Sequence, residues 1–495
     1  MTIKPWTRTV FIHLEGQSEA VPAGGLTLLE EGSRLVGSTF VYGTKYAQRP
    51  NAVSVDPAAL PLSEAQAQPG RQFEPVAGLP LFGAIRDAAP DSWGRRVIEN
   101  KLRAQPNSLS ETVYLMHAGP HRTGALDFRA SPTDKEEKGV LPDAKELSYL
   151  LAAADLIQEG RPVPANLELL FMVGATFGGA RPKAVILDNG RQWVAKFPAV
   201  RDGFNIPVVE RATLELARQC GMRVPAMQSV TLADGREIML IERFDRVPLG
   251  EGQFARRHVV SALTMLKMSE NDAGASAEYA HLAEVINNLG ASGHVATDKE
   301  ELFRRMVFNI LVSNDDDHLR NHAFVWDGTN NGWRLSDLYD VVPKPQIGTE
   351  RYLVLGIGPG AGRLATLDNA LSGAGRFGLR SDQAIDIIEK VSAVVREWRV
   401  YFEAFGVPAA ECDKISSAFR NPRDIGLEKL HASPLPRAQR ADFLVGDTVS
   451  FTDQHLRERI GTIVRLNQKT ASIQCDPNEG HWRVSFALLR KVVDL

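Results

Sequence analysis

The clearest alternation of apolar and polar positions lies between residues 165 and 246. Two apolar runs in "KAVILDNGRQWVAKF" flank the letters "DNG", a combination typical of a β-hairpin with a tight turn. "VERATLELARQCGMRVPA" has apolar residues at helical spacing and ends with Gly221 and Pro225, which stop helices. The runs "MQSVTLADG" and "REIMLIERF" predict a second hairpin. We therefore expect a hairpin, a helix and a hairpin in this order.

The pattern on either side of this stretch is different. Residues 1–135 combine short β-like runs such as "RTVFIHL" with turns and with a helix around "PDSWGRRVIENKLRA", and a polar linker follows. Further on, the spacing is mainly helical, as in "KEELFRRMVFNILVS", with one inserted hairpin in "HAFVWDGTNNGWRLSDLYDVV". We predict four parts, 1–135, 145–250, 251–435 and 441–495, the last of which consists of short strands.

Composition narrows the class of protein. The chain has 495 residues, which is too long for a single core, and its 44% hydrophobic and 24% charged residues are typical of soluble globular proteins. A net charge of -3 gives no overall attraction to nucleic acid or membrane, and the three cysteines are too far apart to form a metal-binding pair. The N-terminus lacks the pattern of a secretion signal and no apolar run is long enough to span a membrane, so we expect a cytoplasmic protein.

A small β-rich lobe with one helix, followed by a helical lobe with an inserted hairpin, is the order of a bilobed protein-kinase-like fold. We therefore expect an α+β protein with an N-terminal α/β lobe, a mainly helical C-terminal lobe and an ATP site between them. Phosphoryl transfer requires a backbone cradle for the phosphates, a cation that pairs with them, magnesium ligands, and an aspartate that orients the attacking hydroxyl. Each of these parts has a candidate in the sequence.

The cradle candidate is "GATFGGARPKAVIL", in which Gly178 and Gly179 precede a strand and Lys183 adds positive charge. A tight turn into the strand is the alternative. The cation candidate is Lys196, which lies in an apolar strand and needs a carboxylate or phosphate partner if it is buried. Its expected partner is Glu210, early on the next helix. The alternative for Lys196 is an edge-strand lysine in water.

The stretch "LIERFDR" is expected to join the two lobes. The backbone groups of Glu242 and Phe244 would then meet the edge of the adenine ring. Plain surface charge is an equally good interpretation of Glu242, Arg243, Asp245 and Arg246. Both interpretations of this stretch, a hinge and an exposed charged segment, therefore stay open.

The stretch "NILVSNDDDHLRNHAFVWDG" carries three consecutive aspartates between two apolar runs. Protein kinases separate the catalytic aspartate from a magnesium-binding asparagine by the spacing D-x-x-x-x-N. Asp316 and Asn321 have this spacing, whereas the two neighbouring aspartates do not. Asp340 in "SDLYDVV" follows the hairpin, where a second metal-binding carboxylate is needed, and Asp337 is its competitor. A solvated turn or a helix cap is the alternative for the acidic loop.

The ordered set of motifs resembles the HipA-type toxin kinases, which are serine/threonine kinases that pair with small helix-turn-helix antitoxins. The resemblance covers about residues 5–435 and rests on "GGARPKA", "VAKFP", "ERFDR", "NDDDHLRNHAF" and "LYDVVP", with "APDSWGRRVIE" and "GALDFR" in the N-terminal subdomain. It implies ATP and Mg²⁺ as cofactors and a protein as substrate. It also implies a HipB-like antitoxin as partner and, through the antitoxin, operator DNA.

The resemblance implies roles for single residues as well. Asp316 would position the target hydroxyl, His318 would hold the same loop in shape, and Asn321 and Asp340 would hold Mg²⁺. The nucleotide-binding set would comprise Gly178, Gly179, Ala180, Lys183, Lys196, Glu210, Glu242 and Phe244.

Two positions depart from the family pattern. Family members carry a serine ahead of the glycine pair that can be autophosphorylated, and Thr176 holds that position here. Autophosphorylation of Thr176 is therefore a hypothesis. Asp317 stands where a small residue is common. A second negative charge there should raise the proton affinity of its neighbour, unless the side chain faces solvent.

The tail from residue 441 lies outside this resemblance. It resembles small SH3-like or KOW-like β-barrels, and Arg465, Lys469, Trp482 and Arg483 would offer a basic and aromatic surface to nucleic acid. Packing on the kinase or binding of a protein is an equally good interpretation of this part.

We predict an ATP- and Mg²⁺-dependent serine/threonine protein kinase that acts as the toxin of a toxin-antitoxin pair and inhibits growth. By the resemblance, its target is an aminoacyl-tRNA synthetase or another translation component. Two alternatives stay open. One is a small-molecule or lipid kinase of the same fold, and the other is a weakly active regulatory protein that works with a DNA-binding antitoxin.

Overall fold

The computed structural model describes residues 2–136, 139–164, 179–199, 201–346, 348–431, 439–452, 458–475 and 480–492. The chain forms two compact units, Met1–Leu427 and Glu428–Leu495. Within the described residues, no helix is both long enough and apolar enough to cross a membrane.

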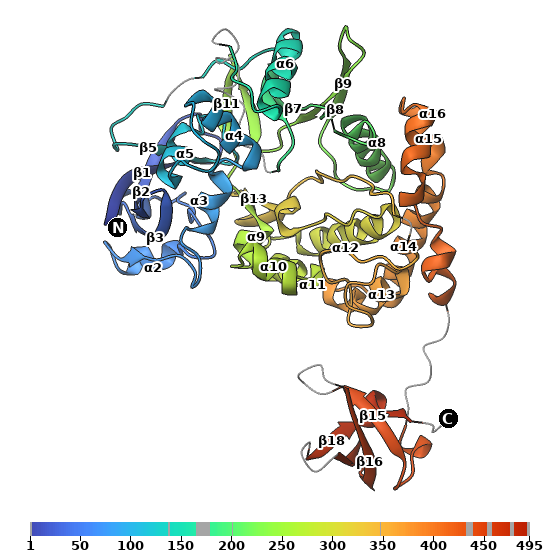
Figure 1. Ribbon diagram of the computed structural model, residues 1–495. Coiled ribbons are helices and arrows are strands. Elements are labelled where there is room, and N and C mark those ends of the chain that lie inside the picture. The colour runs from blue at the N-terminus through green and yellow to red at the C-terminus, as the bar shows by residue number, and fades with distance from the viewer. Residues whose placement is uncertain are drawn as a thin grey trace. The chain divides into compact units, whose positions relative to one another are not determined.

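The N-terminal part of the first unit (residues 2–136) contains a five-stranded antiparallel sheet in the order β4-β3-β2-β1-β5 (Figure 1). Its strands are β1 (Ile3–His13), β2 (Ala20–Glu31), β3 (Arg34–Tyr42), β4 (Gln72–Phe73) and β5 (Leu126–Arg129). The helices between β3 and β5 are α1 (Thr44–Ala47), α2 (Leu62–Ala67), α3 (Gly83–Ala88), α4 (Ser92–Lys101) and α5 (Glu111–His117). Alternate residues of the central strands are buried, among them Leu26, Leu28 and Phe40, as the two-residue period of a strand requires.

Helix α6 (Leu147–Gln158) leads to a second sheet with the strand order β6-β7-β9-β8. The elements of this lobe are β6 (Lys183–Asp188), β7 (Arg191–Lys196), α8 (Ile206–Gln219), β8 (Met227–Thr231) and β9 (Glu237–Glu242). The predicted order of hairpin, helix and hairpin is confirmed. The turn of the first hairpin uses Asn189 and Gly190, whose φ angles of 49° and 70° match the left-handed geometry of a tight hairpin turn.

The core of the second sheet includes residues from the N-terminal part. Trp93 of α4 and Leu150 of α6 belong to the same buried cluster as Trp193 and Leu240 of the sheet. The Trp93 indole N–H also donates a hydrogen bond to the Lys183 carbonyl at 2.9 Å. The N-terminal part therefore helps to build the lobe that carries the strand lysine.

A short hairpin of β10 (Arg246–Gly250) and β11 (Gln253–Arg256) leads into the helical part of the unit. Its helices are α9 (Ala262–Met265), α10 (Glu270–Ser276), α11 (Tyr279–Leu289), α12 (Val295–Val312), α13 (Leu367–Ser372), α14 (Ser381–Arg396), α15 (Trp398–Ala404) and α16 (Ala409–Ile415). A small sheet of three strands is set among them: β12 (Val259–Ser261), β13 (Ala323–Asp327) and β14 (Gly332–Leu335). Strands β13 and β14 form the predicted hairpin, and α12 packs between α11 and α14 (Figure 1).

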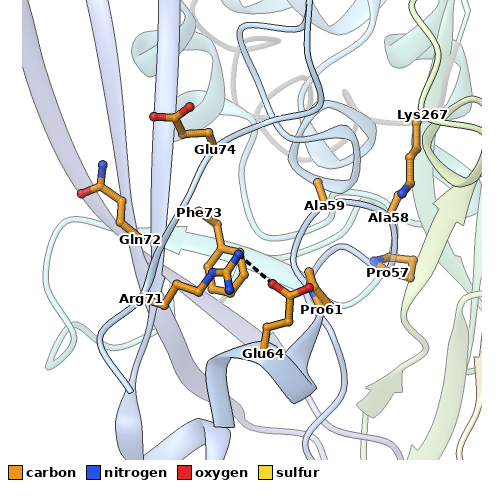
Figure 2. A pocket seen from close by; sticks show the side chains of 10 residues that line it. All are labelled: Pro57, Ala58, Ala59, Pro61, Glu64, Arg71, Gln72, Phe73, Glu74 and Lys267. Carbon is orange, nitrogen blue, oxygen red and sulfur yellow. Dashed lines mark ion pairs between the residues drawn. The ribbon is translucent and has the colours of Figure 1, made fainter. Parts of the chain in front are cut away.

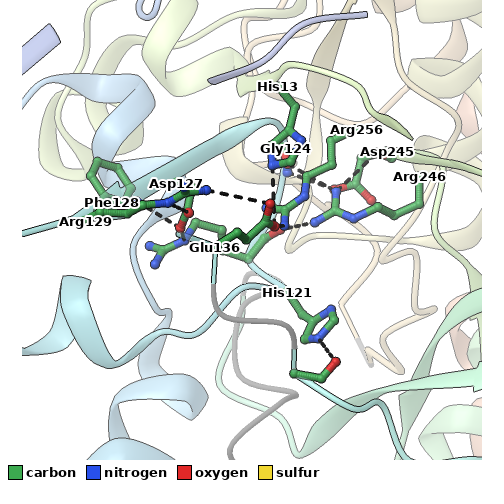
Figure 3. Close-up of polar contacts among 12 residues, drawn as sticks. His13, His121, Gly124, Asp127, Phe128, Arg129, Glu136, Asp245, Arg246 and Arg256 are labelled. Carbon is green, nitrogen blue, oxygen red and sulfur yellow. Dashed lines mark hydrogen bonds and ion pairs between the residues drawn. The ribbon is translucent and has the colours of Figure 1, made fainter. Parts of the chain in front are cut away.

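A buried group of charges joins the N-terminal part to the segment that follows β9 (Figure 3). The buried Asp245 carboxylate accepts hydrogen bonds from Arg243 (2.9 and 2.8 Å), from Arg246 (2.8 Å) and from the Gly124 N–H (2.8 Å). Arg246 also donates to the Arg122 carbonyl at 2.7 Å. Because Arg243, Asp245 and Arg246 are all buried, the surface-charge interpretation of these three residues is wrong.

The same group of charges extends to Glu136 (Figure 3). Its carboxylate pairs with Arg256 of β11 and lies 3.6 Å from Nε2 of His13 in β1. Burial would raise the pKa of Glu136, but the nearby His13 ring and the charge of Arg256 outweigh burial and lower this pKa to about 2. Glu136 therefore stays ionised and links the first sheet to the β10–β11 hairpin.

The second unit contains an antiparallel sheet in the order β18-β17-β16-β15-β19. Its strands are β15 (Thr448–Thr452), β16 (Glu458–Leu466), β17 (Thr470–Cys475), β18 (His481–Ser485) and β19 (Arg490–Lys491). Trp482 is partly buried against the core of this unit, and the Arg459 guanidinium lies 5.8 Å from the centre of a Trp482 ring. Arg465, Lys469 and Arg483 are exposed. Their contact with nucleic acid stays a prediction.

Candidate active site

Three charged side chains from different segments of the chain meet beside the second sheet. Lys196 is the last residue of β7, Glu210 lies in α8, and Asp340 follows β14. The Lys196 ammonium is 2.5 Å from Glu210 Oε1 and 3.0 Å from Asp340 Oδ1. Strand β7 is an inner strand and the Lys196 side chain is only 18% exposed, so the interpretation as an edge-strand lysine in water is wrong. Asp340, rather than its competitor Asp337, supplies the carboxylate that meets Lys196.

Lys196 and Asp340 stabilise each other in the charged form. Burial alone would lower the pKa of the Lys196 ammonium, but Asp340 and Glu210 outweigh burial and raise this pKa. Burial alone would raise the pKa of Asp340, but the Lys196 ammonium outweighs burial and lowers it. An ammonium and a carboxylate are therefore both present at neutral pH, as the binding of phosphate and of a metal ion requires.

The segment that carries Asp340 is held on two sides. The φ of Asp340 is 59°, in the left-handed region that residues other than glycine seldom adopt. The preceding Tyr339 stacks on Phe244, with ring centres 5.7 Å apart and an angle of 27° between the rings. The Tyr339 hydroxyl donates to the Arg320 carbonyl at 2.8 Å. Tyr339 therefore fixes the backbone of Asp340 between the expected hinge and the acidic loop (residues 314–321).

The acidic loop begins where α12 ends. Ser313 stops this helix with a φ of 52°, and its hydroxyl donates to the Ala418 carbonyl at 2.6 Å. The Asn321 side-chain amide donates to the Asp316 carbonyl at 3.0 Å, and the backbone of His318 bonds to both residues at 2.9 Å. The Asp316 side chain is 64% exposed. The two residues with the D-x-x-x-x-N spacing are thus joined in one closed loop, and the Asp316 carboxylate is accessible to an approaching hydroxyl.

Asp317 is buried beneath this loop and does not face solvent. Its carboxylate accepts hydrogen bonds from the Tyr279 hydroxyl and from His322 Nε2, the latter at 3.0 Å. The Tyr279 hydroxyl also accepts a hydrogen bond from the Asn309 amide at 3.2 Å. Burial would raise the pKa of Asp317, but His322 outweighs burial and lowers it. The Asp317 carboxylate is therefore held inside the protein by Tyr279 and His322, and these contacts fix the acidic loop.

Asp315 joins the loop to the chain after Asp340. Its Oδ1 pairs with the Lys344 ammonium at 3.0 Å, and its Oδ2 accepts a hydrogen bond from the Gln346 amide at 2.6 Å. The same ammonium lies 3.7 Å from Oδ2 of Asp316. A cation therefore stands beside the aspartate expected to orient the substrate hydroxyl.

Asn321 and Asp340 supply an amide oxygen and a carboxylate, which are the kinds of ligand that Mg²⁺ prefers. Within the described residues, no three His, Cys, Asp or Glu side chains gather closely enough to hold a metal ion by themselves. A Mg²⁺ ion held by these two residues would need further oxygen ligands from waters and from the phosphates of a nucleotide, as the metal ions of kinases do. The residues present fit that arrangement.

The expected phosphate loop lies only partly within the described residues. Thr176 and Gly178 fall outside them, and their roles stay predictions. Gly179 has a φ of 118°, which residues with a side chain rarely adopt, and the following Ala180 is exposed. The predicted contacts of Gly179 and Ala180 with the nucleotide also stay predictions.

Lys183 connects the end of this loop to the N-terminal part. It is buried, and its ammonium pairs with the Asp91 carboxylate at 2.8 Å and donates to the Gly179 carbonyl at 3.3 Å. Asp91 also caps α4, because its Oδ1 accepts a hydrogen bond from the Gly94 N–H at 2.7 Å. Lys183 therefore has a carboxylate partner in the protein, and its contact with phosphate stays a prediction.

A second aspartate of the N-terminal part reaches the acidic loop. Asp87 lies 3.7 Å from the Arg320 guanidinium and accepts a hydrogen bond from the Ser261 hydroxyl at 2.8 Å. Neither Asp87 nor Asp91 is among the site residues predicted from the sequence. The available signal is the stretch "APDSWGRRVIE", in which Asp91 precedes a helix in the manner of an N-cap.

The Asp91–Lys183 pair can be tested by Asp91→Asn, since asparagine caps helices about as well as aspartate but carries no charge. We expect the free energy of unfolding to fall by about 1.5 to 3 kcal/mol, the usual range for a hydrogen bond to a charged group. The KM for ATP should rise, because Lys183 also contacts Gly179 at the end of the expected phosphate loop. Asp143→Asn is the matched control, because Asp143 is an exposed cap whose Oδ1 accepts a hydrogen bond from the Lys145 N–H at 2.7 Å. Equal stability of both variants would contradict the role of the pair.

The two predicted hinge residues, Glu242 and Phe244, stand on either side of the buried Arg243 in the chain. The Glu242 N–H donates to the Ala226 carbonyl at 2.8 Å, and its carboxylate pairs with Arg191 at 2.5 Å. Phe244 contributes its ring to the stack with Tyr339. Contact of Glu242 and Phe244 with adenine stays a prediction.

A pocket of about 620 Å³ is lined mainly by the N-terminal part (Figure 2). Its lining includes Arg71, which pairs with Glu64 at 2.9 Å and lies 5.2 Å from the centre of the Phe73 ring. Lys267 is the lining residue from the helical part. None of the predicted site residues lines this pocket, so we assign it no part in the site.

The site lies in a part of the chain that matches a known family. Residues 175–398 match the family model described as the HipA-like C-terminal domain. The chain carries a HipA-like C-terminal domain. The matched residues include Lys196, Glu210 and Asp340, which meet beside the second sheet. They also include Asp316 and Asn321, which are joined in the acidic loop. Asp87 and Asp91, which contact Arg320 and Lys183, lie outside the matched residues.

Proteins similar to this chain are known from several bacteria. A Sinorhizobium fredii protein with the name "Putative kinase Y4mE" is 24% identical over 309 residues, which are 58% of this chain and 69% of the relative. The serine/threonine-protein kinase toxin HipA of Shewanella oneidensis is 26% identical over 189 residues, 33% of this chain and 42% of the toxin. A solved structure of the Shewanella oneidensis HipA, HipB and operator DNA complex matches with a TM-score of 0.59 at 16% identity, covering 85% of this chain and 96% of that chain. The structural match shows a shared fold.

Proposed function

We propose that this chain is an ATP- and Mg²⁺-dependent kinase that transfers a phosphoryl group to serine or threonine hydroxyls of a protein. The observation that carries the proposal is the meeting of Lys196, Glu210 and Asp340. These residues come from a strand, a helix and the segment after β14, and phosphoryl transfer needs such a cation and such carboxylates together. The match to HipA-like relatives supports the same conclusion.

Each residue of the site has its own role in phosphoryl transfer. Lys196 binds the phosphates, and Glu210 keeps its ammonium in position. Asp316 orients the substrate hydroxyl and accepts its proton. Asn321 and Asp340 would hold Mg²⁺, which neutralises part of the phosphate charge when it is bound.

The relatives support a proposal for the biological role. The solved complex of Shewanella oneidensis HipA contains HipB and operator DNA, and we propose a HipB-like helix-turn-helix antitoxin and operator DNA as partners of this chain. The protein would then be the toxin of the pair, acting in the cytoplasm on a translation component such as an aminoacyl-tRNA synthetase. The second unit would contact nucleic acid or protein.

Incubation with γ-labelled ATP and Mg²⁺ tests this function. We expect the wild-type protein to transfer label to protein serine or threonine, which acid hydrolysis of the labelled product identifies, and we expect EDTA to prevent the transfer. Lys196→Met should lose both the transfer and the rise in Tm caused by ATP with Mg²⁺, because the phosphates lose their cation. A ligand at 100 times its Kd stabilises a protein by about 2.7 kcal/mol, which thermal unfolding readily detects.

The Tm of Lys196→Met without nucleotide shows whether this variant is folded. Lys196→Arg is a second variant that keeps a positive charge beside Glu210, and it should bind nucleotide more tightly than Lys196→Met. A wild-type protein that transfers no label and whose Tm does not respond to ATP with Mg²⁺ would contradict the proposed function. Label recovered only in a small molecule would favour a small-molecule kinase of the same fold.

A further inference from the structure

A lysine from outside the acidic loop lies beside its exposed aspartate. The Lys344 ammonium is 3.0 Å from Asp315 Oδ1 and 3.7 Å from Asp316 Oδ2. The backbone N–H of Lys344 donates to the Ser313 carbonyl at 3.3 Å, and the Gln346 amide donates to Asp315 at 2.6 Å. These contacts hold the segment that follows Asp340 against the start of the acidic loop.

Two other charged side chains near the loop, Lys196 and Asp317, are more buried than Lys344 and are held by close partners. Lys196 is bound between Glu210 and Asp340, and Asp317 is bound by Tyr279 and His322. The contact of Lys344 with Asp316 is longer than these ion pairs, and the Lys344 side chain is 45% exposed. Its ammonium can therefore move from the aspartate to another anion by rotation of a flexible side chain.

Phosphoryl transfer brings negative charge to this place. Asp316 must lie close to the substrate hydroxyl, and the γ-phosphoryl group must lie in line with that hydroxyl. A carboxylate and a phosphoryl group repel each other at such short distances. A cation placed at the edge of the carboxylate reduces this repulsion and stabilises the negative charge on the transferring group.

We propose that Lys344 is a catalytic residue that contacts the γ-phosphoryl group during transfer, an inference that rests on the proposed kinase function. The oxygen of the substrate hydroxyl forms a bond to the γ-phosphorus. The bond between this phosphorus and the oxygen that bridges the β- and γ-phosphates breaks, and ADP leaves with that oxygen. The hydroxyl proton passes to the Asp316 carboxylate. Lys344 binds the non-bridging oxygens throughout and neither gains nor loses a bond.

Lys344→Met tests this role in the full-length protein. We expect the kcat of ATP hydrolysis and the rate of label transfer to fall on the order of 100-fold, the usual effect of removing one donor to a developing oxyanion. The KM for ATP should change little, because Lys196 and the phosphate loop remain. Lys344→Arg should retain part of the activity. Lys390→Met is the matched control, since Lys390 is an exposed lysine of α14 that pairs with Asp386 at 2.7 Å, and it should match the wild type.

Asp315→Asn separates a catalytic role from a structural one. This variant removes the 3.0 Å ion pair with Lys344 and leaves the lysine in place. If Lys344 acts on the phosphoryl group, Asp315→Asn should cost far less activity than Lys344→Met. Equal losses in both variants would overturn the proposal, because Lys344 would then act only by holding Asp315.

Two further outcomes bear on the proposal. Unchanged ATP hydrolysis in Lys344→Met, with a loss confined to protein phosphorylation, would overturn it in favour of substrate binding by Lys344. Full activity of Lys344→Met in both assays would overturn it as well. A wild-type protein without any ATP turnover or label transfer would instead refute the proposed function, so the two failures are distinguishable.

Discussion

Asp316→Ala is expected to lower the rate of phosphoryl transfer roughly 100-fold to 10,000-fold, the range found when a general base is removed. Asp316 is the aspartate that combines the spacing to Asn321 with an exposed carboxylate, so it is the group that a substrate hydroxyl can reach. ATP binding should persist, because Lys196, Glu210 and Asp340 are unchanged. Label transfer from ATP measures the loss, and the rise in Tm with ATP and Mg²⁺ measures the binding.

Asp315→Ala is the control for Asp316→Ala, since Asp315 lies in the same loop and its contacts are with Lys344 and Gln346. It should keep most of the transfer activity. Asp317→Ala is a poor control despite its position, because Asp317 is buried and binds Tyr279 and His322, so its removal would disturb the fold of the loop. Equal label transfer by wild type and Asp316→Ala would remove Asp316 from the catalytic role.

The elements that carry the site could be predicted because their signals are local. The letters "DNG" demand a tight hairpin turn, and Asn189 and Gly190 have the positive φ that this turn needs. The spacing of Asp316 and Asn321 is a local signal too, and one hydrogen bond from the Asn321 amide closes that loop. Lys196 was a candidate because a lysine in an apolar strand needs a partner, and the structure provides Glu210 as expected.

The burial of individual charges could not be predicted in this way, because a charged residue has the same letter at the surface and in the core. Asp316 and Asp317 are neighbours in one acidic run, yet Asp316 is exposed and Asp317 is buried. Whether an aspartate is buried depends on residues that approach it in space. For Asp317 these include Tyr279, which lies 38 positions earlier in the chain.

Contacts between segments that are distant in the chain were even harder to predict from the sequence than the burial of single charges. Asp91 and Lys183 are 92 positions apart, and Gly124 and Asp245 are 121 positions apart. No period or spacing connects such pairs. The role of the N-terminal part as a support for the site therefore became visible only in the folded chain.

Asp245→Ala is expected to lower the free energy of unfolding by about 3 to 5 kcal/mol, the usual cost of leaving a buried charge without its partner. The Asp245 carboxylate binds Arg243, Arg246 and the Gly124 N–H. Burial would raise the pKa of Asp245, but Arg243 and Arg246 outweigh burial and hold this pKa well below its usual range. The carboxylate is therefore ionised at neutral pH, and its removal leaves two buried guanidinium groups unneutralised. Urea-induced unfolding followed by tryptophan fluorescence measures the effect.

Asp382→Ala is the matched control for Asp245→Ala. Asp382 also lies two positions after its arginine and pairs with Arg380 at 2.9 Å, but both side chains are 70% exposed. An exposed pair of this kind contributes about 0 to 1 kcal/mol, so this variant should unfold much like the wild type. Asp245→Asn keeps the shape of the side chain without its charge and should lie between the two alanine variants. A large loss of unfolding free energy at position 245 but not at position 382 would show that burial of the aspartate, and not its spacing from an arginine, causes the effect. Asp245 would then stabilise the contact between the N-terminal part and the segment after β9.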